Sequence, residues 1–249
     1  MWVLQPMKLL TVRGVPILLD ASWLLLLPLL LWSLAEVAMP TLVPELSRVA
    51  YWAMALTATA GLAASLLLRE GAHLLTAERV GIPLHAVNLL VLGGVADAPP
   101  DAPTRLEAEL TAAATGFLAS LALGSLFLAA FVGMPGPGTP LTVLGVLFLL
   151  AGLNGLMGMA NLVPAYPLSG GRLLRAVFLR WAGDAVAATR GAVLVGVGLG
   201  LAVAAAGAWL LLSGSVLAGL WLVLLGLLVC RAGLARWPVR LARVRSAAS

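Results

Sequence analysis

The pattern of hydrophobic and polar positions along the chain is one of long apolar runs separated by short polar connections. The runs lie near residues 16–36, 50–68, 110–133, 141–163, 187–212 and 214–230. A helix of roughly 20 apolar residues crosses the hydrocarbon core of a bilayer. All six runs have a length near this value, so the pattern predicts six transmembrane helices.

The composition indicates that the whole chain is a membrane protein. Apolar residues make up 62% of the 249 residues, charged residues make up 10%, and the mean hydropathy is +1.07. Soluble globular domains carry about 25% charged residues. We therefore expect an all-α polytopic membrane protein with a single membrane domain over residues 1–249, whose first run is retained rather than removed as a signal peptide. The single Cys230 excludes an internal disulfide and a multi-cysteine metal site.

The basic residues predict the orientation of the chain, because short loops that carry Lys and Arg stay on the cytoplasmic side. They gather before the first run, after the second and fourth runs and at the end of the chain: Lys8, Arg13, Arg79, Arg105, Arg172, Arg175, Arg180, Arg190, Arg231, Arg236, Arg240, Arg243 and Arg245. Both termini are expected in the cytoplasm, with the basic tail 231–249 on the lipid headgroups. In a prokaryote the membrane would be the plasma membrane. Nucleic acid is not an expected partner, since the charge flanks the spans.

Smaller elements are predicted between the spans. Residues 81–103 are too interrupted to span and indicate strand-like segments that end in a glycine turn, Gly93–Ala96. The segment after Arg172 alternates basic and apolar residues with helical spacing, which predicts a helix along the membrane surface. Small residues recur every four positions in two runs, which predicts close helix packing there: Ala112, Gly116, Ser120 and Gly124 in the third, and Gly196 and Gly200 in the fifth.

Two short segments carry the candidate chemistry. The first is Arg69-Glu70-Gly71-Ala72-His73, in the second helix, and the second is the run NLVPAYPLSGGR over residues 161–172. Together they resemble the site-2 protease family of intramembrane zinc metalloproteases. The family pattern is H-E-x-x-H on one helix and N-x-x-P-x-x-P-L-D-G-G-R after another. This chain has Arg69 in place of the first His and Ser169 in place of the Asp.

The resemblance implies a site-2 protease-like core in which zinc activates a water for peptide hydrolysis. Glu70 occupies the position of the general base, and His73 is the only ligand position that matches. The residues that would border a substrate cleft are also retained: Asn161, Pro164, Pro167, Gly170 and Gly171. An interrupted segment of this kind is tolerated at membrane depth where it lines a cavity. The substrate cleft can therefore be retained in a chain that has lost its zinc ligands.

Arg69 is the more consequential of the two departures. At 4 Å and an effective dielectric of 20, a guanidinium repels a dication by about 8 kcal/mol. Our preferred hypothesis is that Arg69 supplies the positive charge that zinc would otherwise bring, with Asp20 or Glu70 as its partner. Glu70 is adjacent in sequence but does not share its helix face well. The alternative is that Arg69 and Glu70 are the solvated end of the second helix.

The remaining polar residues predict structural roles. His85 is expected in a loop or strand, and Asn154 is expected to bind neighbouring helices together. An exposed acidic face before the third run is expected from Asp97, Asp101, Glu107 and Glu109.

Three functions are compatible with these observations. The first is a non-catalytic pseudoprotease that binds transmembrane segments of client proteins, with zinc absent or weakly bound. The second is an active intramembrane zinc endopeptidase with a rearranged site that uses Glu70 and His73. The third is a small-solute transporter, which the shortage of intramembrane ionisable residues and the absence of repeated halves disfavour.

Overall fold

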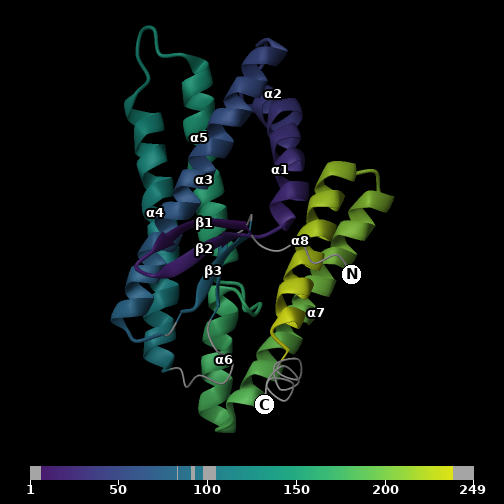
Figure 1. Cartoon of the computed structure of the whole chain (residues 1–249). Helices are drawn as coiled ribbons and strands as arrows, with labels where there is room; N and C mark the ends of the chain where they lie inside the picture. Colours follow the sequence, from purple (N-terminus) through teal and green to yellow (C-terminus); the bar gives the residue numbers. More distant parts are fainter. Residues whose placement is uncertain (1–6, 83, 91–92, 98–104, 238–249) are drawn as a thin grey trace. The chain divides into compact units, whose positions relative to one another are not determined.

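The computed structural model describes residues 7–82, 84–90, 93–97 and 105–237 (Figure 1). Its helices are α1 (Ser22–Ser33), η1 (Leu34–Ala38), α2 (Met39–Leu42), α3 (Arg48–Arg79), α4 (Leu106–Gly133), α5 (Leu141–Ala160), α6 (Ser169–Ala182), α7 (Ala185–Leu212) and α8 (Val216–Ala235). Four short strands complete it: β1 (Met7–Val12), β2 (Val15–Leu19), β3 (Ala86–Leu90) and β4 (Gly93–Asp97). The predicted fold class, a helical membrane protein with a small strand element, is confirmed.

The first apolar run begins as a β-hairpin, so the prediction of a span from residue 16 is wrong. Strands β1 and β2 pair antiparallel. The turn between them contains Arg13 and Gly14 with φ of 48° and 84°, and positive φ at both central residues matches the twist of a two-residue hairpin. Helix α1 starts only after Asp20, whose Oδ1 accepts a hydrogen bond from the Ser22 N–H at 2.8 Å.

Helical backbone then continues over residues 22–42, although it is not regular throughout. Segment η1 is a π-helical stretch between α1 and α2, and Pro40 lies at the start of α2. Since Pro has no N–H to donate to the carbonyl four residues earlier, a local widening of the helix at this point has a direct cause.

Five helices among the described residues are long and apolar enough to cross a membrane, namely α3, α4, α5, α7 and α8. The first run contributes a shorter apolar helix, Leu26–Leu42. The predicted helices near 110–133, 141–163, 187–212 and 214–230 therefore have their counterparts, with ends that differ by a few residues. Helix α3 is the exception, because it runs to Arg79 without a break, well beyond the predicted end at residue 68.

The chain forms two compact units. The first comprises residues 1–74, 88–94 and 115–160, and the second comprises 75–87, 95–114 and 161–249. In the first unit, the Trp23 Nε1–H donates to the Leu89 carbonyl at 3.0 Å. Asn154 Nδ2 donates to Ser65 Oγ at 3.3 Å, so the predicted role of this amide in joining two helices is confirmed. Small residues bring α4 close to α5, since a Cβ on Gly124 would lie 3.1 Å from the Ala151 carbonyl oxygen.

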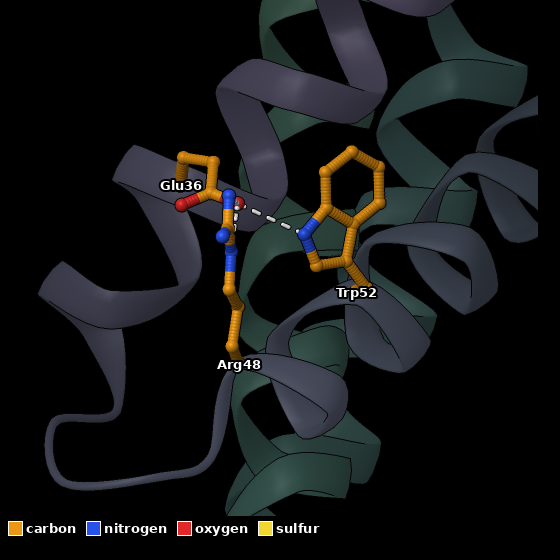
Figure 2. A network of polar contacts seen from close by, with 3 residues as sticks. All are labelled: Glu36, Arg48 and Trp52. Carbon is orange, nitrogen blue, oxygen red and sulfur yellow. Dashed lines mark hydrogen bonds and ion pairs between the residues drawn. The ribbon is translucent and has the colours of Figure 1, made fainter.

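A polar network ties η1 to the start of α3 in the first unit (Figure 2). Arg48 Nη2 lies 2.8 Å from Glu36 Oε1. The same carboxylate oxygen accepts a hydrogen bond from Trp52 Nε1 at 2.9 Å. One carboxylate therefore connects the irregular first helix to the first two turns of α3.

In the second unit, α7 and α8 form an antiparallel helical pair (Figure 1). Its close approach depends on glycine: a Cβ on Gly200 would lie 2.8 Å from the Gly226 carbonyl oxygen. A Cβ on Gly196 would lie 2.8 Å from the backbone nitrogen of Tyr166 and 2.9 Å from its carbonyl oxygen. The predicted close packing at Gly196 and Gly200 is thus confirmed.

The sheet has the strand order β1-β2-β3-β4. The expected glycine turn, Gly93–Ala96, is instead part of strand β4. Residues 91 and 92, between β3 and β4, lie outside the described residues. A pair of glycines that looks like a turn signal has here been accommodated in a strand, which Gly permits at some cost in backbone entropy.

We predict that Gly196→Ala destabilises the protein and that Gly198→Ala does not. The added methyl at position 196 meets backbone atoms that cannot rotate away, which costs about 1–3 kcal/mol. Gly198 lies on the same helix and a Cβ there meets nothing within 4 Å, so its replacement should be neutral or stabilising by about 0.5–1 kcal/mol. Thermal unfolding of both variants in detergent measures this difference, and equal midpoints would contradict the packing described.

Candidate functional site

Arg69, Glu70 and His73 lie in the interior of α3 and are all buried. Their exposed fractions are 2%, 1% and 4%. The helix continues for more than a turn beyond His73. The alternative that Arg69 and Glu70 form a solvated helix end is therefore wrong, and the burial demands a compensating partner for each charge.

Glu70 is the partner of Arg69. Arg69 Nη2 lies 3.0 Å from Glu70 Oε1, with side-chain exposures of 3% and 1%. The other carboxylate oxygen, Oε2, lies 3.8 Å from His73 Nδ1. Adjacent residues such as Arg69 and Glu70 do not share a helix face well, but their side chains are long enough to form the ion pair. The carboxylate of Asp20, the other partner considered, accepts a hydrogen bond from the Ser22 N–H just before α1.

The Arg69 guanidinium is only partly satisfied by the described residues. Its Nε and Nη1 are buried and have no hydrogen-bond partner among them. Gly116 of α4 lies beside it, since a Cβ on Gly116 would be 3.7 Å from Nε. A buried donor without an acceptor costs about 1–3 kcal/mol.

The distal motif forms a tight loop that leads into α6. The Gly170 N–H donates to the Asn161 carbonyl at 2.8 Å, and the Leu168 N–H donates to the Ala165 carbonyl at 2.9 Å. A Cβ on Gly171 would collide with the backbone nitrogen of Tyr166, so only glycine fits there. The two glycines of the motif are therefore required by the packing of the loop on itself.

The loop differs in exposure along its length. Asn161, Pro167, Ser169, Gly170 and Gly171 are buried, and Pro164 is exposed. Leu162 and Val163 are 42% and 41% exposed. The loop therefore presents an apolar tip while its polar backbone is hydrogen-bonded internally.

The residues present do not make a zinc site of the family type. The α3 half offers one imidazole, His73, and a carboxylate, Glu70, that is already paired with a guanidinium. In the distal half, Ser169 stands where the family pattern has its carboxylate. Among the described residues no three His, Cys, Asp or Glu side chains are grouped so that they could hold a metal ion. A structural or catalytic zinc needs at least three such ligands.

Sequence reasoning missed one buried ion pair in the second unit. Arg172 Nη2 lies 2.9 Å from Glu109 Oε2, with side-chain exposures of 7% and 4%. Glu109 was expected on an exposed acidic face, and this is wrong, although Glu107 is exposed as expected. The side chain of Asp97, and all of Asp101, lie outside what the structure describes.

Arg175 is buried as well. Its Nε donates to Thr189 Oγ1 of α7 at 2.7 Å. The segment after Arg172 is the predicted helix, α6, but its first two arginines point into the protein rather than toward a membrane surface.

The other predicted residues have the structural roles expected of them. His85 is exposed and lies just before β3. Cys230 is buried in α8, and its thiol lies 3.5 Å from the Val197 carbonyl oxygen.

Known proteins are similar to this chain in sequence. No protein-family model matches the chain. The protein named "Putative zinc metalloprotease Rip3" of Mycobacterium tuberculosis is 37% identical over 205 residues, which cover 82% of this chain and 52% of that relative. "Putative zinc metalloprotease sll0528" of Synechocystis is 29% identical over 217 residues, covering 86% and 55%. The chain thus spans about half the length of these relatives.

A solved structure shares the fold as well. The site-2 protease from Methanocaldococcus jannaschii matches with a TM-score of 0.67 and 25% identity, over 94% of this chain and 95% of that one. The sequence relatives and the solved structure match most of this chain, which also has five helices long and apolar enough to cross a membrane among its described residues. This multi-pass membrane protein belongs to the site-2 protease family.

Proposed function

We propose that this protein is a pseudoprotease of the site-2 family, which binds transmembrane segments of client proteins and does not cleave them. The observation that carries the proposal is the buried Arg69–Glu70 ion pair at 3.0 Å. It occupies two of the positions where the family pattern has a zinc ligand and a general base. Both termini are proposed to face the cytoplasm, on the distribution of basic residues.

The ion pair affects two requirements of hydrolysis: Arg69 stands at a zinc-ligand position of the family pattern, and Glu70 stands at the position of the general base. A general base must be available to take a proton from the attacking water, but the Glu70 carboxylate is bound to a permanent cation. A guanidinium keeps its charge at every accessible pH, so this engagement does not relax under physiological conditions. The chain can thus keep the shape of the family while losing its chemistry.

Client binding is supported by what the distal motif retains. Its prolines and glycines still interrupt the helical path after α5, and Leu162 and Val163 are exposed at the loop tip. Membrane segments of other proteins are the partner class that such a surface suits.

We predict that Arg69→His together with Ser169→Asp raises the zinc affinity by orders of magnitude. The double change removes the repelling cation and supplies two ligands, which gives three together with His73. Zinc titration of purified protein measures this gain, with Ser169→Asp alone as the control that keeps the guanidinium. No gain in the double variant would mean that the family resemblance does not extend to the pocket.

Arg69→Met should destabilise the protein by about 3–5 kcal/mol, because it leaves Glu70 as a buried charge without its counter-charge. Arg69→Met with Glu70→Gln should recover much of that loss, since the second change removes the charge itself. Chemical denaturation of both variants in detergent gives the coupling. Additive losses would show that the two residues are not energetically paired.

The absence of cleavage has its own test. A photo-crosslinking residue at position 162 in cells should yield adducts that contain client proteins of full length. A crosslinker at Leu194, an exposed position of α7, serves as the lipid-facing control. The set of membrane-protein fragments should be the same with Glu70→Gln as with the wild type. Fragments that disappear in Glu70→Gln, when the variant and the wild type are compared at equal amounts of accumulated protein, would instead identify an active protease.

A further inference from the structure

The segment that follows the distal motif is attached to its neighbours by two buried arginines. Arg172, the last residue of the motif, pairs with Glu109 in the first turn of α4 at 2.9 Å. Arg175, one turn further along α6, donates to Thr189 of α7 at 2.7 Å. Both contacts lie within the second unit. Helix α6 is thereby fixed to two different helices at its N-terminal end, next to the motif.

The Glu109–Arg172 contact is strongly constrained by its burial. The exposures of the two side chains are 4% and 7%, so neither charge can fall back on bulk water. The contact is an ion pair by distance, and Nη2 makes no directed hydrogen bond among the described residues. Its attraction is therefore chiefly Coulombic, which makes it sensitive to the removal of either charge.

We infer that Glu109 and Arg172 are positioning residues that hold the distal loop, residues 161–171, in its folded path. The loop is closed by the hydrogen bond from Gly170 to Asn161, and Arg172 follows Gly170 and Gly171 directly. An arginine fixed at this point sets where the first turn of α6 begins. Ser169, which stands at the ligand position of the family pattern, belongs to that same turn.

Arg172, the last residue of the motif, therefore does more than mark the cytoplasmic side of the membrane. An arginine that only marks the cytoplasmic side would remain solvated, whereas this one is 7% exposed. The inference depends on the proposed function only in treating residues 162–164 as the surface that clients meet. The positioning itself holds whether or not the protein binds a client or a metal.

The test is hydrogen exchange, followed by mass spectrometry, of the full chain in detergent. In Glu109→Gln, exchange of peptides that cover residues 161–172 should rise by about tenfold or more, because the loop opens more often once Arg172 has lost its counter-charge. Peptides from the α7–α8 pair should be unchanged. Glu107→Gln is the matched control, since Glu107 is an exposed acid two residues away in the same turn of α4.

The reversed pair, Glu109→Arg with Arg172→Glu, should restore slow exchange relative to either single change. The reversed pair also tests the positioning role if the Glu109→Gln variant fails to accumulate. The inference is overturned by unchanged exchange of residues 161–172 in Glu109→Gln, by an increase that is equal across α7 and α8, or by a reversed pair no slower than the single variants. None of these outcomes depends on client binding, so the proposed function stands or fails separately.

Discussion

A charge buried in a membrane-spanning helix requires a counter-charge, and the rest of the α3 site depends on how this chain meets that requirement. Metal-dependent relatives of this pattern would bring the positive charge with an ion. Here Arg69 brings it covalently, and Glu70 neutralises it at 3.0 Å. Because both groups are almost fully buried, neither can exchange its partner for water. A divalent cation at this position would therefore have to compete with the ion pair.

The same rule applies at the distal half of the family motif. Arg172 is paired with the carboxylate of Glu109, and Arg175 donates a hydrogen bond to the hydroxyl of Thr189. The chain has 15 basic residues. Some of its arginines thus predict the orientation in the membrane, while others form contacts inside the protein.

Glycine allows close packing of the backbone in the same part of the chain. Gly171 and Gly196 let backbone segments approach Tyr166 more closely than any side chain would permit.

The sequence predicted the helices well and the buried charges poorly, for physical reasons. Long apolar runs have few folded alternatives in a bilayer, so α4, α5, α7 and α8 lie close to their expected ranges. The β1–β2 hairpin was missed because VPILL is as apolar as the helix that follows it, and hydrophobicity alone does not separate a strand from a helix. The turn signal, Arg13-Gly14, is short and was the only local clue.

Ion pairs were harder to predict than helices, because they form between residues that are far apart in the sequence. Glu107 and Glu109 are two residues apart, yet one is exposed and the other is buried against Arg172. The motif residues were singled out in another way, because a known family pattern says which positions carry the metal ligands and the general base. That pattern identified Arg69 and Ser169 as departures. The structure of α3 added that Arg69 forms an ion pair with Glu70, the residue at the general-base position.

Our proposal is that the Arg69 guanidinium takes the place of the metal in this chain. It is tested most directly by the zinc content of the wild-type protein, measured by elemental analysis after purification in detergent and dialysis against metal-free buffer. The account predicts zinc well below one ion per chain. About one tightly held zinc per chain would contradict it, because the Arg69–Glu70 pair would then have to open to admit the ion.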